Sequence, residues 1–159
     1  LGLLSLDIDG VDYWVLKELS FLNPSIIICE YNSLFGKKES ITVPYKKNFI
    51  RSREHFSNLY YGASIKALTN IMKSKNYFLI GTNSAGNNAF FLKKDLWKSL
   101  DKIISKKKIF QSKFRESRNR KGNLNFLDKK KSLELIGNKF IIDLNDKIKK
   151  KILEINLLN

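Results

Sequence analysis

The chain has 159 residues, of which 43% are hydrophobic and 12% aromatic, so it can bury a core and does not have the composition of a disordered protein. Its single cysteine, Cys29, excludes an intrachain disulfide, and with the single histidine, His55, it also excludes a zinc site built from cysteine and histidine. No apolar run reaches the roughly 20 residues of a membrane span, and we expect a cytoplasmic protein.

The formal net charge of +15 would suit a nucleic-acid partner. Lysine, however, supplies most of the 30 basic residues, and arginine supplies few. Arginine binds phosphates and bases through a planar fork of donors, whereas lysine is a strongly hydrated point charge. We therefore interpret the positive charge as the compositional bias of a sequence rich in Lys, Ile and Asn.

The first elements along the chain predict a β-α-β unit. Residues 3–8 are a short apolar run that ends in acid, as a strand before a turn does. Residues 11–22 carry apolar side chains at helical spacing, with Asp12 near the positive end of the helix dipole and Pro24 after its end. Residues 25–31 are apolar on both faces, which predicts a central strand of the parallel type covered by helices.

The middle of the chain begins with a polar stretch, residues 32–61, that is too long for a simple connection and is typical of a lid or a binding loop. Within it, residues 36–40 (GKKES) contain Lys and Ser as phosphate loops do, but no strand leads into them, so we interpret them as a solvated turn. Residues 62–75 predict an amphipathic helix, and residues 76–83 and 88–94 predict an antiparallel hairpin.

The last third of the chain has a different composition. Residues 102–131 are dense in Lys and Arg, whereas residues 132–159 contain a strand candidate at 140–144 and a Lys-rich helix. We therefore divide the chain into residues 1–100, an α/β domain, and residues 101–159, a basic C-terminal extension.

Polar side chains follow two strands that we expect to be neighbours. Asp7 and Asp9 come at the end of the first strand, and Glu30 and Asn32 come at the end of the second. The carboxyl ends of adjacent parallel strands face one crevice, which is where open α/β sheets bind ligands. Carboxylates this close repel one another, so one has a raised pKa or they share a cation or a substrate amine. His55 has no Ser or Cys at the spacing of a triad, so we expect it at most to bind substrate.

The order and spacing of several motifs are similar to those of a known family. DIDG at residues 7–10, Asp12 followed by VL at 15–16, and CE at 29–30 resemble the latter half of the class I S-adenosylmethionine-dependent methyltransferases, in particular the FkbM-like group. In that group a strand ends in Asp-Val/Ile-Glu-Gly, the next helix carries Glu-x-x-Val-Leu and the next strand ends in Ile-Glu. The resemblance covers residues 1 to about 100 and extends to a subgroup of bacterial methyltransferase-like proteins.

The resemblance implies an α/β fold class with a partial Rossmann-like sheet, strands four to seven, which ends in an antiparallel hairpin. It implies S-adenosylmethionine as cofactor, bound by an N-terminal half outside this sequence, and O-methylation of a sugar, a glycan or a small metabolite. It makes Asp7 and Asp9 the catalytic residues, and the substrate-binding residues are Asp12, Glu30, Asn32 and His55. In a variant of this hypothesis Asp7 or Asp9 holds Mg²⁺ together with Glu30 and Asn32, as in certain catechol-type methyltransferases.

The alternative function is nucleic-acid binding by residues 102–131, where Phe110, Phe114 and Phe126 are interleaved with basic residues as in single-strand binders. A third role for this basic stretch is contact with an anionic membrane surface or with lipid-linked glycans. The methyltransferase hypothesis is the preferred one of the three. The sequence leaves open the methyl acceptor, the need for a metal and the oligomeric state.

Overall fold

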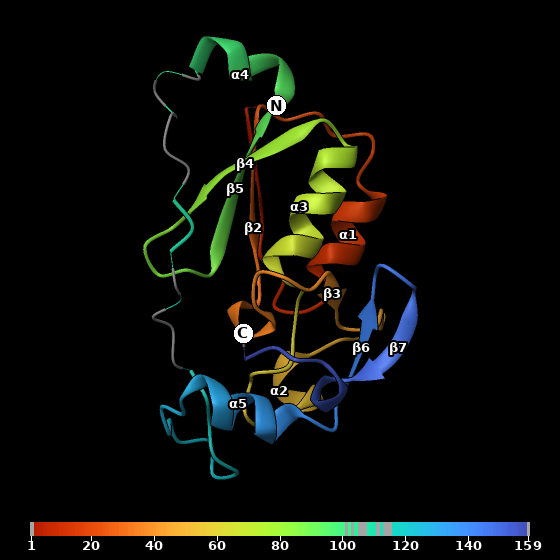
Figure 1. Cartoon of the computed structure of the whole chain (residues 1–159), viewed down its shortest axis with the longest axis vertical. Helices are drawn as coiled ribbons and strands as arrows, with labels where there is room; N and C mark the ends of the chain where they lie inside the picture. Colours follow the sequence, from red (N-terminus) through yellow and green to blue (C-terminus); the bar gives the residue numbers. More distant parts are fainter. Residues whose placement is uncertain are drawn as a thin grey trace.

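The computed structural model describes residues 2–100, 102, 104, 108–110, 112 and 116–158. These residues form a mixed α/β structure with two sheets (Figure 1). The larger sheet has the order β1 (Leu3–Leu6), β2 (Ile26–Glu30), β5 (Asn88–Lys93) and β4 (Tyr77–Thr82). β1 is parallel to β2, while β5 lies antiparallel to both β2 and β4. The α/β class and the antiparallel hairpin expected from the sequence are confirmed.

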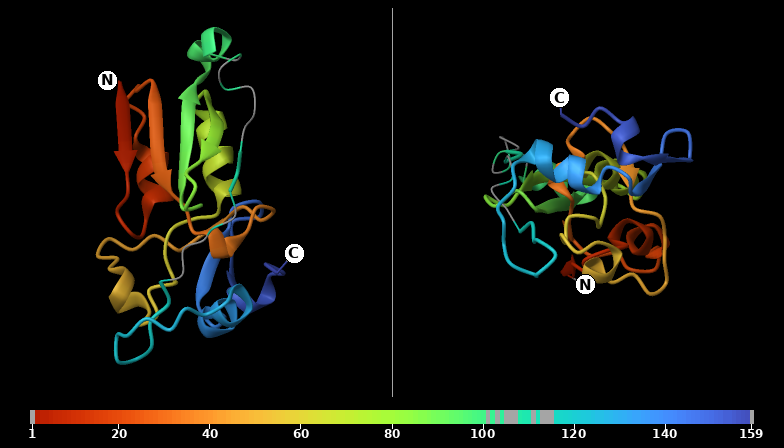
Figure 2. Two further views of the ribbon diagram at one scale, coloured as in Figure 1. Left: turned by 90° about the vertical axis from the view of Figure 1, so that its left-hand side faces the viewer. Right: turned by 90° about the horizontal axis from the view of Figure 1, so that it is seen from below.

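Two helices, α1 (Asp12–Glu18) and α3 (Ile65–Ser74), lie on the same face of this sheet (Figure 1). Between them and the strands is an apolar core in which Leu16 and Phe91 are almost completely buried. The prediction that helices cover β2 on both faces is wrong for the described residues, because the second face carries no helix and Ile28 on it is only half-buried. The left view of Figure 2 shows the strands in front of the two helices.

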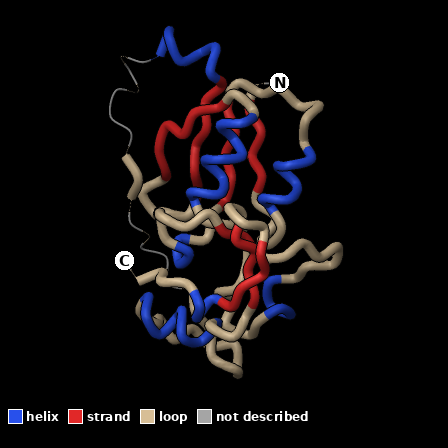
Figure 3. The backbone as a smooth tube through the Cα atoms, turned by 45° about the vertical axis from the view of Figure 1, so that its right-hand side comes forward, coloured by secondary structure: helices blue, strands red, loops and turns tan. Residues whose placement is uncertain are grey.

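A smaller sheet joins segments that are far apart in the sequence. It has the order β3 (Ile41–Thr42), β6 (Phe140–Asp143) and β7 (Ile148–Lys151), with both pairs antiparallel. Figure 3 shows it beyond one end of the larger sheet, next to the loops that leave the parallel strands. The division of the chain at residue 100 did not anticipate this pairing. One sheet contains strands from the polar stretch 32–61 and from the C-terminal residues.

The smaller sheet has a core of its own. Its side chains come from the polar stretch, from α5 (Lys129–Ile136) and from the C-terminal strands, and the fully buried ones are Phe35, Ile41, Val43, Ile136 and Ile141. Residues 32–61 are therefore not a detached lid. They also carry a 3-10 turn, η1 (Ser33–Phe35), and a one-turn helix, α2 (Arg51–Glu54).

The prediction of a Lys-rich helix within 132–159 is wrong: the lysines of Ile148–Lys151 form strand β7, and the part of α5 in this region, residues 132–136, contains no lysine. The turn between β6 and β7 favours their antiparallel pairing. In it, Asp143 accepts hydrogen bonds from Asn145, and Lys147 adopts a φ of 62°. A second 3-10 turn, η2 (Ile152–Glu154), follows β7, and α4 (Lys94–Leu100) follows β5. None of the helices in the described part of the chain is long and apolar enough to cross a membrane.

Candidate functional site

Asp7 and Asp9, which follow β1, meet Glu30, the last residue of β2, at the carboxyl ends of these two strands. The parallel register places Leu6 opposite Cys29, so the residues that follow leave the sheet at the same edge. One oxygen of each carboxylate lies within 4.8 Å of the others. The structure thus brings together the three acids that adjacent parallel strands lead one to expect. We call Asp7, Asp9 and Glu30 the acid group.

A turn, rather than a continued strand, delivers Asp9 to the acid group. β1 ends at Leu6, and Asp9 has a φ of 55°, in the left-handed region that aspartate tolerates better than most residues. Asp12 holds this turn: its two carboxylate oxygens accept hydrogen bonds from the backbone N–H groups of Ile8 and Gly10, both at 3.0 Å. Asp12 is 1% exposed, and burial raises its pKa against the effect of these hydrogen bonds. Its position therefore gives it a structural role, while contact with a substrate stays a prediction.

Glu30 is the buried member of the acid group. It is 5% exposed, and its Oε2 atom has no hydrogen-bond partner within the described part of the chain. Burial, followed by the negative charge of Asp7, raises the pKa of Glu30 to about 8, although Arg51 acts in the opposite direction. A carboxyl group with such a pKa exchanges its proton close to neutral pH, as a general acid or base must.

Arg51 connects the acid group to the C-terminal part of the chain. Its Nη1 donates to Asp9 at 2.7 Å, its Nη2 to Glu116 at 3.2 Å and its Nε to the carbonyl of Asn58 at 2.6 Å. The guanidinium carbon also lies 3.6 Å from the centre of the Tyr61 ring. These contacts fix the position of the guanidinium, and the two carboxylates offset its positive charge. Sequence reasoning missed Arg51, because its two carboxylate partners, Asp9 and Glu116, lie far from it along the chain.

Two further predicted substrate-binding residues are tied into the loops. The Nδ2 atom of Asn32 donates to the carbonyls of Leu59 at 2.9 Å and Tyr61 at 3.0 Å, and Asn32 is 1% exposed. His55 holds its Nδ1 at 2.7 Å from Ser57 Oγ, and burial lowers its pKa. The structure thus gives both side chains partners that order residues 32–61, and it does not bring His55 into the acid group.

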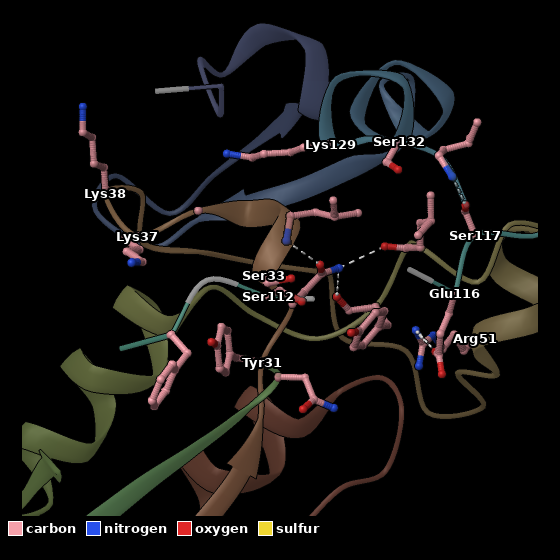
Figure 4. A pocket seen from close by; sticks show the side chains of 18 residues that line it. Tyr31, Ser33, Lys37, Lys38, Arg51, Ser112, Glu116, Ser117, Lys129 and Ser132 are labelled. Carbon is pink, nitrogen blue, oxygen red and sulfur yellow. Dashed lines mark hydrogen bonds and ion pairs between the residues drawn. The ribbon is translucent and has the colours of Figure 1, made fainter. Parts of the chain in front are cut away.

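A cavity of about 420 Å³ lies next to the end of β2 (Figure 4). Residues after β2, residues of the 51–61 segment and residues of the basic stretch line it, so it lies where the two sheets adjoin. Lys37, Lys38 and Lys129 are among its lining residues, as are Arg51 and Glu116. Arg51 lines the cavity and also donates a hydrogen bond to Asp9, so the cavity and the acid group are neighbours that share this contact, although no member of the acid group is among the lining residues. Lys129 was not identified from the sequence, because only the fold brings it near residues 37 and 38.

The acid group has the donors of a hard divalent cation. Carboxylate oxygens suit Mg²⁺, and the Oε2 atom of Glu30, which has no hydrogen-bond partner among the described residues, is a candidate ligand. Asp9, however, is already neutralised by Arg51, and the Oδ1 of Asn32 accepts a hydrogen bond from Leu34 N at 3.1 Å. The donors that fit the magnesium hypothesis are therefore Asp7 and Glu30, without Asn32.

The basic stretch lies in part along the edge of the larger sheet. Thr82 N donates to the carbonyl of Lys108 at 3.0 Å, and Phe110 N donates to Thr82 Oγ1 at 2.9 Å. Phe110 is 39% exposed and Phe126 59% exposed, whereas Phe114 lies outside the described residues. The segment thus covers the edge of β4 with its backbone and leaves these two rings accessible to solvent.

Comparisons of the chain with protein-family models, with curated proteins and with solved structures found no match.

Proposed function

We propose that the chain belongs to an S-adenosylmethionine-dependent O-methyltransferase and supplies the side of the active site that binds the methyl acceptor, a sugar or another small hydroxylated molecule. The observation that carries the proposal is the convergence of Asp7, Asp9 and Glu30 at the carboxyl ends of two adjacent parallel strands. The strand order supports it too, since a parallel pair followed by an antiparallel hairpin agrees with the pattern that the resemblance implies.

S-adenosylmethionine, when bound, supplies a methyl group on a positively charged sulfur, which a hydroxyl oxygen attacks in line. The residues of this chain act on that hydroxyl. The exposed carboxylates of Asp7 and Asp9 accept hydrogen bonds from the acceptor and orient it, and Arg51 fixes Asp9. Glu30, in its ionised form, takes the proton of the attacking hydroxyl, a task for which a pKa of about 8 is suitable. Sequence reasoning assigned Glu30 to substrate binding, and its burial makes it the better proton acceptor of the three acids.

The test is an assay of methyl transfer with the complete protein encoded by the gene, using a panel of sugars and other hydroxylated acceptors. We expect formation of S-adenosylhomocysteine, with turnover reduced about 100-fold in Glu30→Gln and about tenfold in Asp7→Asn and Asp9→Asn. Glu18→Gln, at the exposed end of α1, is the matched control and should retain full turnover. A protein that turns over no hydroxylated acceptor, or that is unaffected by all three substitutions, would refute the proposal.

A further inference from the structure

The cavity next to the acid group has an excess of positive charge. Lys37 and Lys38 lie on the turn after η1, and Lys129 lies in the first turn of α5 (Figure 4). Among the described residues, no carboxylate forms an ion pair with Lys37, Lys38 or Lys129. Figure 4 shows Lys129 extending toward the turn that carries the other two. Residues 36–38, the first part of the stretch interpreted from the sequence as a solvated turn, therefore form a wall of this cavity.

The charges of the cavity are unevenly distributed. Arg51 faces the acid group and is neutralised by Asp9 and Glu116, so it has little net attraction left for an anion. The carboxylate of Glu116 also repels an anion from that end. The three lysines at the opposite end have no carboxylate partner within the part of the chain that the structure describes, so an anionic group in the cavity is most stable beside them.

The remaining walls suit a small molecule that carries hydroxyl groups. Ser33, Ser117 and Ser132 contribute hydroxyls, and the buried rings of Tyr31 and Tyr61 contribute flat apolar surface with a polar edge. A volume of about 420 Å³ is within the range of roughly 300–1,000 Å³ that is usual for sites of small ligands. A polynucleotide is a poorer fit, because it would bring several phosphates, one of them toward Glu116.

We propose that this cavity binds a small phosphorylated polyol, such as a sugar phosphate, with the phosphate held by Lys37, Lys38 and Lys129. The hydroxyl-bearing part of the ligand then lies toward Arg51 and the acid group. The inference rests on the proposed function in one respect, namely that it makes this ligand the methyl acceptor. Binding of the phosphate itself depends only on the described cavity.

The experiment is a calorimetric titration of the 159-residue chain with inorganic phosphate, glucose 6-phosphate and glucose at constant ionic strength. We expect both phosphates to bind, glucose 6-phosphate more tightly than inorganic phosphate, and glucose not to bind measurably. The double variant Lys37→Gln/Lys129→Gln should weaken binding of glucose 6-phosphate about tenfold or more. The matched control is Lys66→Gln/Lys73→Gln, which removes the same charge from exposed positions on α3 and should change affinity less than about twofold.

Equal weakening by the two double variants would mean a general attraction of anions to a basic chain and would overturn the inference. So would absence of phosphate binding. A short single-stranded oligonucleotide that binds more tightly than glucose 6-phosphate, and that depends on Lys37 and Lys129, would instead identify the site as a nucleic-acid interface. Phosphate binding at the cavity without methyl transfer to any acceptor would contradict the proposed function alone. Methyl transfer without phosphate binding would contradict this inference alone.

Discussion

Replacement of Glu30 by glutamine should make the protein more stable at alkaline pH and leave its stability unchanged in acid. The side chain is buried, and folding raises its pKa from the ordinary value of 4.5 to about 8. At about 1.36 kcal/mol per pH unit, this shift corresponds to roughly 5 kcal/mol when the carboxyl is ionised. Because Asp7 and Asp9 are exposed to solvent, screening by water reduces the expected effect to roughly 2–3 kcal/mol.

The sign of the effect follows from where the proton is bound. Between pH 4.5 and about 8 the folded protein keeps the proton of Glu30, while the unfolded chain has released it. The contribution of Glu30 to the free energy of unfolding is therefore zero below pH 4.5, becomes less favourable as the pH rises, and is constant above pH 8. Glutamine resembles the protonated carboxyl in shape and carries no charge at any pH, so the variant lacks this contribution.

Urea unfolding followed by tryptophan fluorescence at several pH values measures the effect. Wild type and Glu30→Gln should agree at pH 4 within about 0.5 kcal/mol, whereas at pH 8.5 the variant should be more stable by roughly 2–3 kcal/mol. Glu18→Gln, which removes an exposed carboxylate, should follow wild type at both values. If the stability curves of wild type and Glu30→Gln run parallel from pH 4 to pH 8.5, the reasoning about Glu30 is wrong.

Three further predictions concern the turn that carries Asp9, all measured by urea unfolding. Asp12→Ala should destabilise the protein by about 2–4 kcal/mol, because the buried N–H group of Gly10 and the part-buried N–H group of Ile8 lose their acceptor; a loss below about 0.5 kcal/mol would contradict this. Gly10→Ala should destabilise the protein by about 1–3 kcal/mol, since the added carbon would lie 2.4 Å from the Phe49 ring. An unchanged urea midpoint would show that the ring moves aside without cost and would contradict this prediction. Asp9→Ala should be about 1 kcal/mol less stable than Asp9→Asn, because asparagine tolerates the left-handed backbone and alanine does not; equal stabilities would contradict that explanation.

Local patterns predicted much of the larger sheet. Alternation and apolar runs identified β1, β2 and the β4–β5 hairpin, while helical spacing identified α3. The helix begins at Ile65, not at 62 as predicted, because the hydroxyl of Ser64 accepts a hydrogen bond from Ala67 N and caps it. The acid group could be predicted because the carboxyl ends of adjacent parallel strands lie at the same edge of a sheet. Applying this rule requires no knowledge of contacts between distant segments.

Contacts between distant segments could not be predicted in this way. β3 has two residues, too few for a periodic pattern, and it exists because Ile41 pairs with Asp143. The same pairing brings α5 to the polar stretch, so Lys129 and Lys37 line one cavity only in the folded chain. The ion pair of Arg51 with Glu116 likewise joins distant segments, and no local sequence pattern relates the two residues.

The pairing of β3 with β6 also constrains how the protein folds as it leaves the ribosome. Among the described residues, all four strands of the larger sheet have been synthesised once β5 has emerged. The segment around Phe35 and Ile41 has to wait for residues near 141, with its apolar side chains uncovered in the meantime. Contacts so distant in sequence form slowly, so synthesis should pass through a state in which one sheet is finished and the other has only its first strand.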